Sequence, residues 1–119
     1  MKTTLFKLVD GQVEPEVCEV PVWAAPDENG QTAAEVQNSP KLSITFYRIP
    51  VGCVVPIHAG PHYTVCQIVS GQGKLALPSS RELEFVGPEL FLFEAGALHG
   101  WQDVVEDLLL TVCEVKDAS

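Results

Sequence analysis

Residues 52–71 read GCVVPIHAGPHYTVCQIVSG, and the fold follows from this stretch. It holds two runs of apolar and β-branched residues, separated by His-Ala-Gly-Pro-His. Runs of this kind bounded by Gly and Pro are typical of strands, and Gly60-Pro61 marks a turn between them. The stretch therefore predicts two strands joined by a loop that carries His58 and His62.

The same pattern continues on both sides of this stretch. Short apolar runs are broken by Gly, Pro, Asn or Asp, and no helical period separates them. Such strands without intervening helices favour a closed barrel or a sandwich. We predict Gly71-Gln72-Gly73 to be a hairpin turn. The predicted strands are Thr4–Val9, Val17–Val22, Lys41–Ile49, Val51–His58, Val65–Ser70, Lys74–Leu77, Leu83–Val86, Leu90–Glu94 and Leu108–Val115.

The bulk composition limits the class of protein. A chain of 119 residues with 46% hydrophobic and 19% charged residues is typical of one globular domain. The net charge of −9 argues against a nucleic acid or an anionic membrane as partner. No apolar run approaches the roughly 18 residues that cross a bilayer, and no secretory signal is evident. We therefore expect a cytoplasmic protein with free cysteines.

Two regions differ in composition. Residues 1–40 are predicted to form N-terminal strands and a polar loop that pack on the barrel or on a partner subunit, and residues 41–119 to form the barrel core. Residues 24–40 are rich in Asp, Glu, Asn, Gln, Ser and Pro, and they are expected to be a surface loop. The alternatives are a lid or a segment that contacts a second subunit.

The three histidines of the chain are the candidates for chemistry. His58, His62 and His99 all lie beside turns rich in Gly or Pro, where side chains project into the mouth of a barrel. Neutral imidazole is also the commonest metal ligand. If residues 58–64 stay extended, His58 and His62 share one face. If Gly60-Pro61 breaks the period, they flank a loop instead.

The arrangement of these residues resembles the cupin superfamily over residues 41–115. Gly52, His58 and Gly71 are in register with the first cupin motif, which contains His-x-His followed by Glu and Gly. Gly96 and His99 keep the spacing of the second motif. The resemblance implies an all-β fold, namely a small double-stranded β-helix or jelly-roll barrel. It also implies a homodimer, since small cupins often pair through their outer strands.

The resemblance also implies a metal centre with a degenerate ligand set. In the family, two histidines and the glutamate of the first motif bind one divalent metal together with the histidine of the second. Gly60 and Thr64 occupy two of those four positions here. The implied site is then His58, His62 and His99 around zinc, iron, nickel or manganese. The residues expected to line the pocket beside it are Thr64, Gln67, Glu94 and Trp101.

Three functions remain open at this point. The first is a small-molecule-binding cupin with a metal that supports oxygenase, isomerase or lyase chemistry. The second is a metal-free ligand-binding or sensor barrel without catalysis. The third is a structural dimer whose barrel is filled by side chains. The sequence leaves open whether the chain is an enzyme, and it favours a small molecule and a second copy as partners.

Overall fold

The computed structural model describes residues 3–18 and 22–116, and the regular elements within these ranges are all strands. The all-β class predicted from the sequence is therefore confirmed. Within the same ranges the chain forms no helix that is long and apolar enough to span a membrane. The strands are β1 (Thr3–Val9), β2 (Gln12–Cys18), β3 (Thr32–Asn38), β4 (Leu42–Ile49), β5 (Val55–His58), β6 (Tyr63–Ala76), β7 (Glu82–Val86), β8 (Glu89–Phe93) and β9 (His99–Val115).

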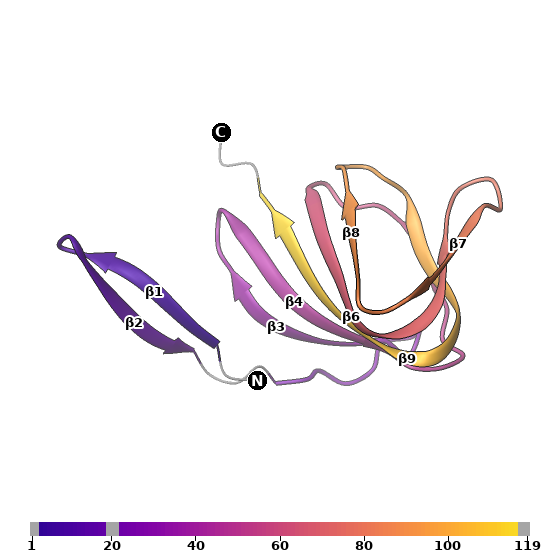
Figure 1. The fold of residues 1–119 in the computed structure, drawn as a ribbon, viewed down its shortest axis with the longest axis horizontal. Helices are drawn as coiled ribbons and strands as arrows, with labels where there is room; N and C mark the ends of the chain where they lie inside the picture. Colours follow the sequence, from indigo (N-terminus) through magenta and orange to yellow (C-terminus); the bar gives the residue numbers. More distant parts are fainter. Residues whose placement is uncertain (1–2, 19–21, 117–119) are drawn as a thin grey trace.

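One antiparallel sheet curls into the barrel (Figure 1). Its strand order is β3-β4-β9-β6-β7, while β5 pairs with β9 and β8 pairs with β6. Each strand alternates its side chains between the interior and the outside. The apolar core fills one part of the interior, and its largest fully buried side chains are Ile49, Cys66, Ile68, Leu108 and Leu110.

The strands β6 and β9 are longer than the sequence indicated. The predicted turn at Gly71-Gln72-Gly73 is wrong, because these residues lie inside β6. The strand bends there, and its register with β9 shifts at several points between Ile68 and Lys74. Gly71 has φ 109°, and a Cβ atom on it would lie 2.4 Å from the carbonyl oxygen of Asp107. Glycine therefore serves a close strand crossing here rather than a chain reversal.

The polar segment 24–40 contains a strand that the sequence did not predict. Thr32–Asn38 forms β3, an edge strand that pairs with β4. The part before it is irregular, and Asp27 organises that part. The Oδ1 atom of Asp27 accepts hydrogen bonds from the backbone N–H groups of Asn29 (2.9 Å) and Gln31 (3.0 Å). The expectation of one long surface loop is therefore corrected to a short loop followed by an edge strand.

The N-terminal strands form a hairpin of their own. β1 and β2 make a separate two-stranded sheet that extends to one side of the barrel (Figure 1). Thr3–Val9 agrees closely with the first predicted strand. The second lies earlier in the chain than predicted, at Gln12–Cys18, and residues 19–21 of the prediction fall outside the described residues.

Candidate functional site

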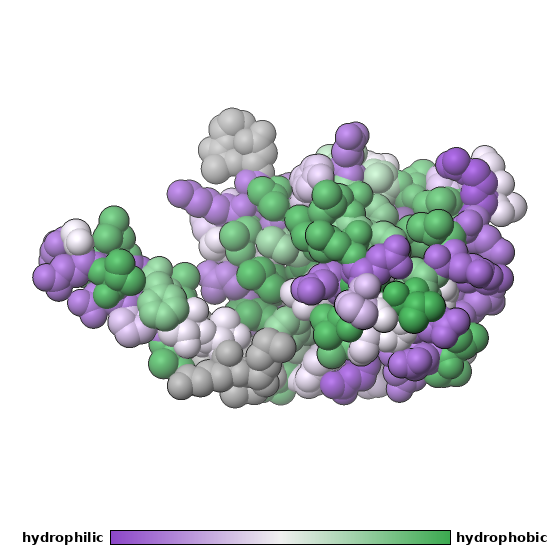
Figure 2. Space-filling view, in the orientation of Figure 1, coloured by the Kyte–Doolittle hydropathy of each residue, from purple (hydrophilic) through white to green (hydrophobic). Residues whose placement is uncertain are grey.

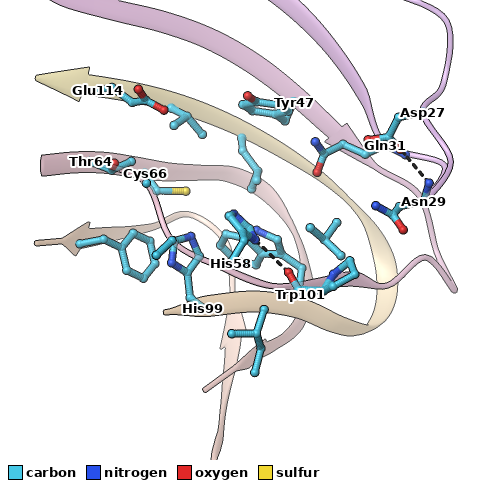
Figure 3. A pocket seen from close by; sticks show the side chains of 18 residues that line it. Asp27, Asn29, Gln31, Tyr47, His58, Thr64, Cys66, His99, Trp101 and Glu114 are labelled. Atoms are coloured by element: carbon cyan, nitrogen blue, oxygen red, sulfur yellow. Dashed lines mark hydrogen bonds between the residues drawn. The ribbon is translucent and has the colours of Figure 1, made fainter. Parts of the chain in front are cut away.

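A cavity of about 470 Å³ opens into the barrel between β4, β5, β6, β8 and β9 (Figure 3). Its inner wall is mainly apolar and includes Val55, Phe93, Trp101 and Leu110. Its polar groups come from the strand interiors and from the loop before β3. They are Asp27, Asn29, Gln31, Tyr47, His58, Thr64, His99 and Glu114.

Two histidines lie side by side in the wall of this cavity. His58 ends β5 and His99 begins β9, and their Cα atoms are directly opposite in the antiparallel register. Their ring centroids lie 4.7 Å apart. Gly100 allows the two strands to approach this closely, because a Cβ atom on it would lie 2.6 Å from the carbonyl oxygen of Val55. The pair is therefore built by backbone pairing and by one glycine.

Backbone hydrogen bonds orient both imidazoles in the same way. Nδ1 of His58 lies 2.8 Å from the carbonyl oxygen of Pro56, and Nδ1 of His99 lies 3.0 Å from that of Ala97. A carbonyl oxygen only accepts, so Nδ1 carries the hydrogen in each ring. In the neutral rings, Nε2 is then a free acceptor. The site offers two such acceptors side by side.

Burial favours the uncharged form of three groups in the cavity wall. Desolvation lowers the pKa of His99 below its usual 6.5; the hydrogen bond to Ala97 opposes this and the neighbouring His58 adds to it. Burial raises the pKa of the Cys66 thiol to about 12. Burial and, to a smaller extent, the charge of Glu114 raise the pKa of Tyr47. At neutral pH these groups are therefore an imidazole, a thiol and a phenol.

The structure brings some of the predicted site residues together and separates others. His58, Thr64, His99 and Trp101 line the cavity. His62, Gln67 and Glu94 are not among its lining residues.

Each of the separated residues has a local reason for its position. Gln67 is exposed because its side chain points to the opposite face of β6 from those of Thr64 and Cys66. Glu94 is exposed just after the end of β8. His62 lies beyond the end of β5, because Gly60-Pro61 breaks the extended path.

Several lining residues were not predicted. Tyr47 and Glu114 lie on β4 and β9, and alternation within their strands was the signal that could have found them. Asp27, Asn29 and Gln31 come from the polar segment, and no pattern in the sequence indicates that it folds over the cavity.

The donor set does not fit the transition metal that the family resemblance implied. Within residues 3–18 and 22–116, no group of three or more His, Cys, Asp or Glu side chains is placed to hold a metal ion. Catalytic zinc sites use three protein ligands. Cys66, Asp27 and Glu114 also line the cavity, but none of them completes a three-ligand group with the imidazoles of His58 and His99. The two imidazoles with the Thr64 hydroxyl are a poor ligand set for zinc, iron, nickel or manganese. The set His58, His62 and His99 is not assembled.

Comparison with solved structures places this geometry in a known fold. The cupin domain of Cnp3 from Schizosaccharomyces pombe matches with a TM-score of 0.73 and 14% identity, covering 98% of this chain and 88% of that one. KdgF from a Halomonas species matches with a TM-score of 0.67 and 15% identity, covering 81% of this chain and 89% of that one. An RmlC-like cupin from Methanocaldococcus jannaschii, which has a double-stranded β-helix fold, matches with a TM-score of 0.66 and 16% identity. The match covers 80% of this chain and 89% of that one.

Sequence comparison adds nothing to this likeness. No family model matches the chain, and no curated protein matches it in sequence. Because the structural neighbours share few residues with it, their likeness concerns the fold. The chain has the cupin fold, a double-stranded β-helix barrel, with a cavity at the position where two histidines meet.

Proposed function

We propose that the chain binds a small, uncharged, hydroxyl-rich molecule in the barrel cavity, without a resident transition metal. The observation that carries this proposal is the histidine pair, in which hydrogen bonds through both Nδ1 atoms leave two Nε2 acceptors at the cavity. A hydroxyl group donates to such an acceptor, whereas a carboxylate or phosphate ester oxygen does not.

The size and lining of the cavity support a ligand of this kind. Small-molecule sites are clefts of roughly 300–1,000 Å³ with mainly apolar walls and a few placed polar groups. A volume of about 470 Å³ with Trp101 and Phe93 on the wall meets that description. Tyr47 adds a hydroxyl group that donates and accepts, and Thr64, whose hydroxyl donates to the carbonyl oxygen of His62, adds an acceptor. The cavity can therefore hold a molecule of the size of a monosaccharide.

The charges around the cavity favour an uncharged ligand over an anion. Asp27 and Glu114 contribute carboxylates, and no Lys or Arg is among the described lining residues. Arg48 lies over the ring of Trp23, with its guanidinium carbon 4.3 Å from the ring centroid, and it is not a lining residue. An anionic ligand would meet like charges and no cation.

The three histidines make a direct binding test. Each Hε1 proton gives its own NMR signal, and His62 serves as an internal control because it does not line the cavity. We expect neutral aldoses such as galactose to shift the signals of His58 and His99 and to leave that of His62 unchanged. Galacturonate, which adds one carboxylate to the same ring, should bind at least about tenfold more weakly. Equal binding of both sugars, or no shift at either histidine across a panel of aldoses and polyols, would contradict the proposal.

Elemental analysis tests the metal-free part of the proposal. Untagged protein, purified without chelator, should contain metal only at background, and His58→Ala and His62→Ala should equal the wild type. Near-stoichiometric metal that is lost in His62→Ala would instead establish the three-histidine site that the sequence predicted, and our proposal would be wrong.

A further inference from the structure

A short polar loop lines one side of the barrel cavity. Residues 27–31, which we name the cavity loop, contribute Asp27, Asn29 and Gln31 to the lining. In Figure 3 these side chains lie on the side of the cavity away from His99, and Gln31 extends toward Tyr47. The cavity loop can therefore contact a part of a bound molecule that the histidine pair does not reach.

Hydrogen bonds within the cavity loop hold its backbone. The N–H groups of Asn29 and Gln31 donate to Oδ1 of Asp27. The N–H group of Gly30 donates to the carbonyl oxygen of Asp27 (3.0 Å), and that of Asp27 donates to the carbonyl oxygen of Gln31 (2.9 Å). The loop therefore presents Asn29 and Gln31 to the cavity from a defined backbone.

The side-chain amides of the cavity loop are unused by the chain itself. Within residues 3–18 and 22–116, neither the carboxamide of Asn29 nor that of Gln31 makes a hydrogen bond, and both residues are half-buried. A carboxamide has an oxygen that accepts hydrogen bonds and an NH₂ group that donates them. Two hydroxyl groups on adjacent carbon atoms match this pair, because one donates to the oxygen while the other accepts from the nitrogen. Each amide is thus suited to a vicinal diol.

We infer that the cavity loop selects ligands that carry a vicinal diol, which the carboxamides of Asn29 and Gln31 bind while another hydroxyl group donates to the histidine pair. The inference rests on the proposed function, because it concerns a ligand of the same cavity. It narrows the ligand class to polyols and aldoses with hydroxyl groups on neighbouring carbons. The histidine pair supplies acceptors alone, and the cavity loop adds the donors that a hydroxyl oxygen needs.

A close contact fixes the position of the cavity loop on the barrel. Gly30 has φ 83°, and a Cβ atom on it would lie 2.7 Å from Sγ of Cys53. Cys53 lies in the turn of residues 50–53, where the N–H group of Gly52 donates to the carbonyl oxygen of Val104 on β9 (3.1 Å). A side chain at position 30 would therefore push the cavity loop, with its two amides, away from this turn.

Deoxy sugars test the diol contact. The ligands are galactose and its 2-, 3- and 4-deoxy analogues, and each vicinal diol of the galactose ring includes at least one of these positions. At least one analogue should bind the wild type about fivefold or more weakly than galactose does, in titrations followed by the Hε1 signals of His58 and His99. Asn29→Ala and Gln31→Ala should each weaken galactose binding by a similar factor and remove this preference. Gln67→Ala deletes the same carboxamide on the opposite face of β6 and should change no affinity.

A second set of variants tests the position of the cavity loop. Gly30→Ala should weaken galactose binding about fivefold or more, and adding Cys53→Ala should recover affinity by making room for the methyl group. Gly11→Ala is the control, because Gly11 shares the positive φ (77°) and a Cβ atom there has nothing within 4 Å. Gly11 lies in the turn of the β1–β2 hairpin, which projects from the barrel in Figure 2 and contributes no lining residue.

The outcomes separate this inference from the proposed function. If the wild type binds no aldose or polyol, both fail. If it binds galactose, and Asn29→Ala and Gln31→Ala keep its affinity and its preference among the deoxy analogues, only the role of the cavity loop is refuted. Full galactose affinity in Gly30→Ala would likewise refute that role, with circular dichroism melting curves confirming that each variant is folded.

Discussion

The imidazole of His99 lies flat on the ring of Phe93, with the ring centroids 3.8 Å apart and the planes inclined by 10°. Phe93 ends β8 and His99 begins β9, so the stack joins the strands on either side of one turn. The stack leaves the His99 side chain only 8% exposed, and its Nδ1–H group donates a hydrogen bond to the carbonyl oxygen of Ala97. A side chain that can carry charge is thus held in a mainly apolar wall.

The first prediction concerns acid stability. Burial lowers the pKa of His99 below 6.5, so the unfolded chain binds the proton more tightly than the folded chain. The contribution of His99 to the free energy of unfolding is full above pH 6.5 and is lost as the pH falls through the folded pKa. At pH values below 6.5 we expect the urea concentration at the unfolding midpoint to decrease. This decrease should be smaller in His99→Gln than in the wild type. An NMR titration midpoint for His99 above 6.5 would contradict this account.

The second prediction concerns the strand contact that aligns the histidines. In Gly100→Ala the new methyl group would lie 2.6 Å from the oxygen of Val55 and 2.9 Å from the nitrogen of Ile57. We expect β5 to move away from β9, with a loss of about 1–3 kcal/mol in urea denaturation and changed Hε1 signals for both histidines. Gly60→Ala is the control, because a Cβ atom there has nothing within 4 Å. Equal stability of the two variants would refute the role of Gly100.

The third prediction concerns the bend in β6. Gly71→Ala combines an unfavourable φ of 109° with a clash against Asp107 and Leu108. We expect it to lower the free energy of unfolding by about 2–4 kcal/mol. Gly52→Ala shares the positive φ but meets nothing within 4 Å, so it isolates the backbone contribution and should cost about 1 kcal/mol. The difference between their urea midpoints measures the destabilisation caused by a methyl group at the close crossing of β6 and β9.

The fourth prediction concerns thiol reactivity. The pKa of Cys66 is about 12 against 9.0 for an ordinary thiol, which corresponds to a roughly thousandfold smaller thiolate fraction. Iodoacetamide at mildly alkaline pH should therefore label Cys53, which is half-buried, well before Cys66. Peptide mass spectrometry of the native protein measures the order, and labelling in urea should abolish the difference. Early labelling of native Cys66 would show that the cavity wall opens to the reagent.

The barrel could be predicted because its strands carry strong local signals. Leu42–Ile49 and Leu90–Glu94 alternate or concentrate β-branched and aromatic residues between Gly and Pro, and both strands are present within about a residue of the prediction. β3 was missed because Thr-Ala-Ala-Glu-Val-Gln-Asn has little intrinsic strand preference. It is held by its pairing with β4, which is a long-range contact that no local pattern reveals.

The candidate site was predictable only where a residue type is rare. Three histidines beside glycines directed attention to His58 and His99, and the structure pairs them. The position of His62 depends on how Gly60-Pro61 turns, which the spacing left open. Carboxylates such as Glu114 are common in this acidic chain, so only the strand register distinguishes the one that lines the cavity from those in solvent.

The strand β9 presents its side chains in alternation to the cavity and to the outer side of the sheet. Leu110, Val112 and Glu114 line the cavity, while Thr111, Cys113 and Val115 lie on the opposite side of the sheet. Inserting a single residue ahead of Leu110 would exchange the two sets, sending Glu114 outward and Cys113 inward. Inserting two residues would restore the assignment. The length of β9 is therefore constrained by parity, so natural variation in this strand should occur in steps of two residues.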